Sequence, residues 1–125
     1  MSANELINPI APLAIKVKSV TLSPTGAVTQ GTSVSTAVTS NYASGVIACF
    51  TSTAAAGVIA SFTLNNSLIV AGSRVVCSVT NYSGTTGIPY VFSNAVTAGS
   101  CTISVANAAT AAALNGVVSV FFRLV

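Results

Sequence analysis

The sequence predicts an all-β protein, a jelly-roll-like antiparallel β-sandwich of about eight strands behind an extended N-terminal arm. From residue 15 onward, apolar and small polar residues alternate with a period of two, in runs rich in valine, isoleucine, threonine and phenylalanine. Turn signals rich in glycine, serine and asparagine interrupt these runs at spacings of roughly 8–12 residues, which is typical of sandwiches and barrels. Because 125 residues are the length of one ordinary domain, we divide the chain into an arm, residues 1–14, and a sandwich domain, residues 15–125.

The first 14 residues, MSANELINPIAPLA, differ from the rest of the chain. Pro9 and Pro12 remove backbone donors and oppose a helix. Large apolar residues are unusual in a disordered tail, so we expect an arm that docks on a partner; a frayed terminus is the alternative. The residues expected to dock are Leu6, Ile7, Ile10 and Leu13.

Strand-like runs then follow one another along the chain. They cover residues 17–22, 34–40, 46–52, 58–64, 74–80, 101–106 and 117–125. Alternation places Phe62 with Leu64, and Cys101 with Ile103, on single faces of their strands. The last run is apolar on both faces near its end, which is typical of a strand covered on both sides.

Residues 107–114, NAATAAAL, are the one helical candidate. Alanine favours helix, and Asn107 is a suitable N-cap residue. A loop that crosses between the two sheets is the alternative.

The chain is nearly free of charge and of catalytic side chains. Charged residues make up 4% of it, against roughly 25% in a typical soluble domain. It has no histidine, and Glu5 is its only acidic side chain. General acid–base catalysis and metal sites need His, Cys or carboxylate groups in clusters, so we expect neither an enzyme, nor a cofactor, nor a bound metal.

The same composition argues against nucleic-acid and membrane partners. Lys16 and Lys18 are close together, but Arg74 and Arg123 are isolated, so no basic stripe forms for nucleic acid. Ser, Thr, Asn or Gly interrupts every apolar stretch before it reaches the length of a membrane span. The N-terminus lacks the basic and apolar regions of a signal peptide, so we expect synthesis in the cytoplasm.

Three cysteines, at positions 49, 77 and 101, are an odd number with wide spacing. Each lies in a strand-like run, so we expect small buried hydrophobic residues rather than a disulfide framework. An intersubunit or adventitious bridge is the alternative. A catalytic thiol needs a base or an electropositive partner to form the thiolate, and the chain has no histidine.

A chain this apolar and uncharged predicts an obligate oligomer or a part of a larger assembly. Soluble surfaces normally carry charge on roughly a quarter to a third of positions. Exposed sheet edges are normally guarded by lysine or proline, and that guard is mostly missing here. In the last strand-like run Arg123 alternates with apolar neighbours and faces away from the core. We therefore expect an oligomer interface at Phe121, Arg123 and Val125.

Tyrosines beside Gly- and Ser-rich loops are candidate partner contacts. Tyr82 lies within the segment 81–89 and Tyr90 directly follows it, while Tyr42 is a third candidate. We expect Tyr82 and Tyr90 to contact a receptor or another partner. The alternative is that these rings tuck onto strand ends.

Residues 61–84 and 94–125 resemble a recurring pattern in virion proteins of bacteriophages and large viruses. The resemblance rests on turn and core positions: Asn66-Ser67, Ala98-Gly99-Ser100, Asn107, Leu114-Asn115-Gly116 and Phe122. It implies a small jelly-roll-like β-sandwich, often trimeric, found as capsid decoration or at the tips of viral fibres. It supplies no catalytic residues.

The function expected from this resemblance is a capsid decoration, or cement, protein of the virion. Such a protein binds the outer shell as a homotrimer and stabilises it, with the major capsid protein or other virion proteins as partners and the arm as the docking segment. The alternative is the tip module of a head or tail fibre, which binds a receptor on the host surface.

Overall fold

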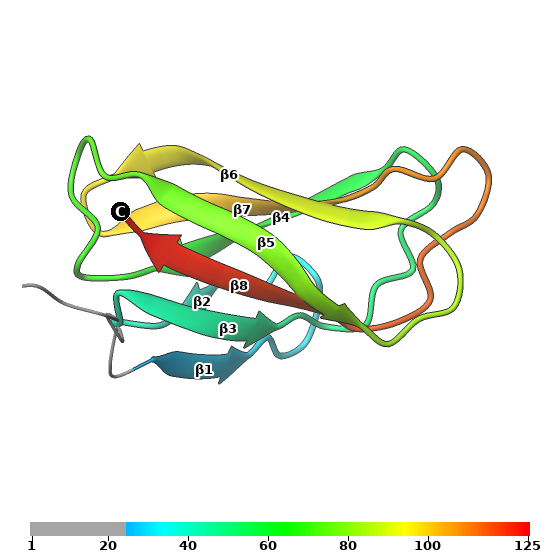
Figure 1. Cartoon of the computed structure of the whole chain (residues 1–125), viewed down its shortest axis with the longest axis horizontal. Helices are drawn as coiled ribbons and strands as arrows, with labels where there is room; N and C mark the ends of the chain where they lie inside the picture. Colours follow the sequence, from blue (N-terminus) through cyan, green and yellow to red (C-terminus); the bar gives the residue numbers. More distant parts are fainter. Residues whose placement is uncertain (1–24) are drawn as a thin grey trace, which may run out of the picture.

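Two packed β-sheets form the part of the chain that the structure, a computed structural model, describes: residues 25–125 (Figure 1). The strands are Gly26–Thr29 (β1), Val38–Thr39 (β2), Ser44–Ala48 (β3), Ile59–Asn65 (β4), Val75–Tyr82 (β5), Pro89–Thr97 (β6), Ser100–Asn107 (β7) and Val118–Leu124 (β8). The predicted all-β sandwich of about eight strands is confirmed. The arm and the strand-like run 17–22 lie outside the described residues.

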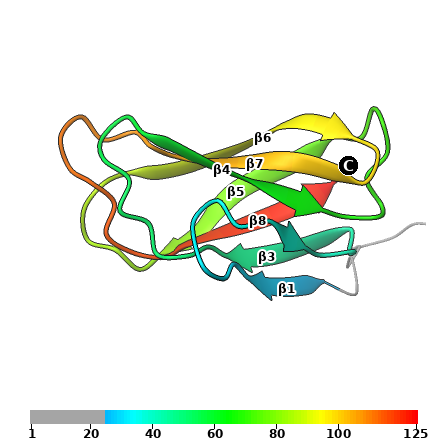
Figure 2. The ribbon, with the colours of Figure 1, turned by 180° about the vertical axis from the view of Figure 1, so that it is seen from behind.

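The chain changes sheets at almost every step. The first sheet has the order β1-β3-β8-β5 and the second the order β2-β4-β7-β6. Only β6 and β7 are consecutive strands of the same sheet, and Figure 2 shows the second sheet from behind. Each sheet is therefore assembled from strands that are distant in sequence, and β7 and β8 each lie in the interior of a sheet.

Each sheet contains one parallel pair, so both sheets are mixed. β1 runs parallel to β3, and β2 parallel to β4, while the remaining pairs are antiparallel. The parallel pairs result from the way the chain connects their strands. Between β1 and β3 the chain crosses to the other sheet and back, so it enters the second strand from the same end. Alternation fixes the face of a residue but not the direction of the neighbouring strand.

The core lies between the two sheets, where the inward residues of each strand meet. Ile47 and Val120 are Cα partners in the first sheet, and Phe62 and Ile103 are Cα partners in the second. All four are buried, as alternation predicts. Cys49 and Cys101 are also buried, which confirms that they are small core residues.

A buried asparagine organises the loops at one end of the sandwich. The side chain of Asn107 donates to the carbonyls of Ala54 (3.0 Å) and Ala112 (2.8 Å). It accepts hydrogen bonds from the backbone N–H groups of Ile88 (3.1 Å) and Ala109 (3.0 Å). The segment after β7 is accordingly a loop that crosses to β8, which was the alternative to a helix. Asn107 bonds the surrounding loops instead of capping a helix.

A second buried amide shapes the loop before β2. Gln30 Nε2 donates to the carbonyls of Val34 (3.0 Å) and Thr36 (2.8 Å), and its Oε1 accepts from the Phe50 N–H (2.9 Å). These bonds hold residues 33–36 in turns, so only Val38–Thr39 of the strand-like run 34–40 pairs as a strand. The amide supplies bonds that a longer ladder would otherwise make.

Candidate functional site

The outward side of the first sheet carries apolar residues together with two arginines, a surface we call the arginine face. Val46 of β3 is the Cα partner of Phe121 in β8, and Arg123 is the Cα partner of Val76 in β5. The backbone N–H of Val125 donates to the Arg74 carbonyl (2.9 Å), so this pairing continues one step further. The arginine face consists of Val46, Arg74, Val76, Phe121, Arg123 and Val125.

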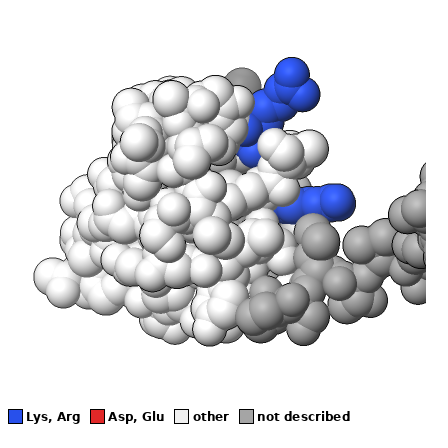
Figure 3. All heavy atoms as spheres, turned by 90° about the vertical axis from the view of Figure 1, so that its left-hand side faces the viewer, with Lys and Arg blue, Asp and Glu red and all other residues white. Residues whose placement is uncertain are grey.

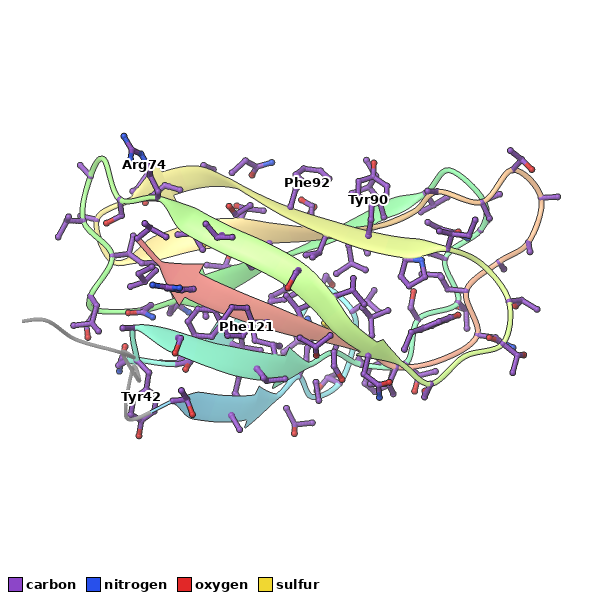
Figure 4. The ribbon with its side chains drawn as sticks, in the orientation of Figure 1. Tyr42, Arg74, Tyr90, Phe92 and Phe121 are labelled. Carbon is purple, nitrogen blue, oxygen red and sulfur yellow. The ribbon has the colours of Figure 1, made fainter. Side chains whose placement is uncertain are left out.

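The apolar members of the arginine face are open to solvent. Val76 is 52% exposed and Val125 is 69% exposed, while Val46 is 38% exposed and Phe121 is half-buried. Figure 4 shows Phe121 in front of the ribbons of the first sheet and Arg74 at the end where β5 begins. Exposed apolar side chains grouped in this way are typical of a contact surface.

All the charged side chains of the described residues lie on this face. Arg74 and Arg123 are the only charged side chains in residues 25–125, and both are exposed. Figure 3 shows the cationic side chains of the described residues projecting on the same side of the molecule. The register places the two arginines diagonally on neighbouring strands, roughly 7 Å apart at Cα.

The outward side of the second sheet carries an uncharged apolar surface, which we call the aromatic face. Ala106 of β7 is the Cα partner of both Ile59 in β4 and Tyr90 in β6, and Phe92 lies two residues further along β6 on the same face. The rings of Tyr90 and Phe92 stack with centroids 6.1 Å apart, and Figure 4 shows them projecting from β6. Ile59 is 52% exposed and Tyr90 is 47% exposed. We define the aromatic face as Ile59, Tyr90, Phe92 and Ala106.

The residues predicted from sequence fall into separate places. Phe121, Arg123 and Val125 lie together on the arginine face, whereas Tyr90 lies on the aromatic face of the opposite sheet. The predicted docking residues Leu6, Ile7, Ile10 and Leu13 lie outside the described residues. The structure therefore places the predicted oligomer contact and one predicted partner contact on opposite sides of the sandwich.

Tyr82, the other predicted partner contact, is half-buried at the end of β5. Its hydroxyl donates to the Thr86 carbonyl (2.6 Å) and accepts from the Asn115 N–H (2.8 Å). The Asn115 side chain accepts in turn from the backbone N–H groups of Thr85 and Thr86. These bonds tie the loop after β5 to the loop before β8, so the hydroxyl of Tyr82 already has partners within the chain.

Sequence reasoning missed six members of these surfaces: Arg74, Val76 and Val46 on the arginine face, and Ile59, Phe92 and Ala106 on the aromatic face. The period-two alternation of the strand-like run 74–80 could have shown that Arg74 and Val76 share its outer face, because their neighbours in the chain are buried or half-buried. Only the pairing of β5 with β8 brings them beside Arg123.

A groove of about 290 Å³ opens beside the loops that follow β1 and β3. Apolar side chains line it, among them Val34, Phe50 and Val58, together with the hydroxyls of Ser33 and Ser52. None of its lining residues is ionisable, so it offers shape and hydroxyl groups but no acid–base chemistry.

Desolvation raises the pKa of all three cysteine thiols, of which Cys49 and Cys101 are buried and Cys77 is half-buried. Desolvation raises the pKa of the Cys49 thiol and that of the Cys77 thiol to about 11. The value for Cys77 includes two smaller effects: the nearby Cys101 raises the pKa, and a hydrogen bond with Ser93 lowers it. All three thiols are free. A thiol with a raised pKa is a poor nucleophile because the thiolate is the reactive form.

Stability should accordingly fall in alkali. Because the folded state raises the pKa of Cys49, the unfolded chain loses its proton first, and stability present below pH 9 is lost as the pH rises toward 11. We expect this thiol to lower the free energy of unfolding by up to about 1.4 kcal/mol per pH unit in that window. Urea denaturation at several pH values measures the slope. Cys49→Ala should show a slope smaller by this amount, and an identical slope would contradict the assignment.

Metal sites and membrane helices are not found in the described part of the chain. In residues 25–125 no group of three His, Cys, Asp or Glu side chains is placed to hold a metal ion. The same residues contain no helix long and apolar enough to cross a bilayer.

Comparison with protein-family models, curated proteins and solved structures finds no match.

Proposed function

We propose that this chain is a structural protein of a virus particle, a decoration protein that binds the outer shell as a homotrimer and stabilises it. The observation that carries the proposal is that both outer faces of one small sandwich expose apolar clusters, while residues 25–125 hold only two charged side chains. Covering such faces with other chains is favourable, because it removes their apolar side chains from water. The resemblance of residues 61–84 and 94–125 to virion sandwiches supplies the class of assembly.

The stabilising effect needs no catalysis. A protein that binds the assembled shell, and not its loosened form, shifts the equilibrium toward the assembled shell by mass action. Contacts repeated over three linked copies add avidity, since each further contact forms at a high effective concentration. The arm, with Leu6, Ile7, Ile10 and Leu13, is proposed to add docking contacts to the shell. Its residues lie outside those that the structure describes.

Charge favours the aromatic face for the contact between copies. Self-association through the arginine face brings the guanidinium groups of Arg74 and Arg123 from several copies together, and residues 25–125 contain no acidic side chain to pair with them. The aromatic face is uncharged and self-contact there costs no repulsion. The contact expected from sequence, through Phe121, Arg123 and Val125, is the alternative that the same experiment tests.

Sedimentation of the purified protein tests the assembly. We expect a mass three times the 12.3 kDa of one chain. Ile59→Asp buries a charge in the proposed contact and should weaken assembly by about 100-fold or more. Phe121→Asp makes the same change on the arginine face and should leave the mass unchanged. The reverse result would place the contact at Phe121, and a wild-type chain that remains a soluble monomer would contradict the proposal.

A fibre-tip module is the second candidate function, and the observation that favours it is the stack of an exposed Tyr90 ring on the half-buried ring of Phe92. Exposed aromatic rings supply much of the contact area in recognition surfaces. If the chain is a fibre-tip module, fluorescently labelled protein should bind host cells saturably, and Tyr90→Ser should lower this binding. A decoration protein instead binds purified shells and not cells.

A further inference from the structure

We propose that the arginine face is the surface that meets the shell, and that Arg74 and Arg123 each pair there with a carboxylate of the shell protein. The inference rests on the proposed function and names the chemistry of the partner: an acidic, partly apolar protein surface. It also separates two roles by sheet, with copies meeting at the aromatic face and the shell at the arginine face.

The first argument is the missing counter-charge. Arg74 immediately precedes β5 and Arg123 lies on β8, at diagonal positions of the backbone pairing, and no residue from 25 to 125 has an acidic side chain. Glu5, the only acidic side chain of the whole chain, is a single carboxylate for four basic residues. A partner that places carboxylates opposite the two arginines supplies a counter-charge that no side chain of residues 25–125 provides. Guanidinium groups suit this role because their donors match a carboxylate in pairs.

The second argument is the apolar surroundings of the two cations. Val76 lies directly across from Arg123, and Val125 lies across from Arg74. Phe121 and Val46 continue the apolar surface toward β3. When a partner covers these side chains, water leaves the neighbourhood of the ion pairs, and the attraction between charges grows as the local dielectric constant falls. Neighbouring contacts that exclude water are typical of strong interface residues.

The number of cations favours a protein over the other anionic partners. Nucleic-acid binding usually neutralises many phosphates, and anionic membranes are recognised by clusters of roughly four to eight Lys or Arg. This face has two arginines set among valines and one phenylalanine. Two bidentate pairs inside an apolar surface are the arrangement of a protein–protein contact.

Binding to purified shells that lack the protein tests the inference, with co-sedimentation as the measurement. The double variant Arg74→Gln/Arg123→Gln removes two positive charges from the face. We expect it to bind shells about 10- to 100-fold more weakly than wild type, with an unchanged assembled mass. Lys16→Gln/Lys18→Gln removes the same charge from another part of the sequence and should weaken binding less than about 3-fold. Wild-type binding should weaken as NaCl is raised, and binding of the Arg variant should respond less.

The outcomes separate this inference from the proposed function. If wild type binds shells and the Arg74→Gln/Arg123→Gln variant binds equally well, the arginine face is not the docking surface, although the decoration function stands. If the two double variants lose the same amount of binding to shells, the effect comes from net charge alone and the inference is overturned. If wild type does not bind shells, the proposed function itself fails. Arginine-dependent binding to vesicles of phosphatidylserine and phosphatidylcholine, without shell binding, would identify a lipid partner and overturn the inference as well.

Discussion

Asn107→Asp is expected to lower the free energy of unfolding by about 4 kcal/mol, because it changes the chemistry of a buried group without changing its shape. Asn107 is 1% exposed, and its amide nitrogen donates to the carbonyls of Ala54 and Ala112. In the variant an oxygen faces these two carbonyls, so two attractive contacts become repulsive. The variant also buries an acidic group that has no cation within reach in the described residues, which hold only two exposed arginines.

The pH dependence of that variant gives a second readout. Burial and the facing carbonyls favour the protonated acid, so the folded state raises the pKa of the new carboxyl above its value in the unfolded chain. A raised pKa makes the variant most stable at low pH and less stable as the pH rises, so acid should restore part of the loss. Chemical denaturation between pH 3 and about 8 measures both effects.

The matched control is Asn94→Asp on the exposed outer side of β6. The chemical change is identical there, but the side chain is open to water, so the free energy of unfolding should change by less than about 0.5 kcal/mol. A loss below about 1 kcal/mol in Asn107→Asp, or equal losses in the two variants, would show that Asn107 does not hold the loops together.

The importance of Asn107 marks a limit of sequence reasoning. An asparagine with these sequence neighbours suits a helix cap, a loop or a solvated surface equally well, because an amide side chain can form hydrogen bonds with the backbone in all three settings. Four bonds to loops that lie apart in the sequence become visible only when those loops are placed together. Gln30 is a similar case: its bonds shorten β2, although the alternation of residues 34–40 predicts a longer strand.

Alternation correctly gives the faces of β4 and β8, whereas β6, the longest strand, is not among the strand-like runs read from the sequence. Phe62 and Leu64 share the inner face of β4, and Phe121 and Arg123 share the outer face of β8, as their spacing predicts. The same period says nothing about which strands are neighbours or whether they run parallel. Half of the arginine face was therefore predictable, whereas its second arginine required the pairing of β5 with β8.

The second large effect is expected at Gly45 in β3, where a glycine is required by a close approach and not by a turn. Gly45 is the Cα partner of both Gly26 in β1 and Phe122 in β8. A Cβ atom at position 45 would lie 2.5 Å from the Gly26 carbonyl oxygen and 2.9 Å from the Phe122 ring. The first neighbour is backbone and the second is a fully buried ring, so neither can move without disturbing a strand.

Gly45→Ala should consequently lower the free energy of unfolding by about 3 kcal/mol, measured by urea denaturation. Overpacking is the cause, since alanine otherwise suits a strand at least as well as glycine does. Gly31→Ala is the matched control, because no atom lies within 4 Å of the added Cβ there, and its effect should stay within about 0.5 kcal/mol.

The position of β1 decides how the loss in Gly45→Ala is distributed. β1 is an edge strand, held in its sheet by β3 alone, so the cheapest way to accommodate the new methyl group is for β1 to move away from Gly45. Hydrogen exchange should then rise first in β1, while β7, in the interior of the other sheet, keeps its protection. Uniform exchange throughout the sandwich would show that the ring of Phe122, and not the edge strand, absorbs the clash.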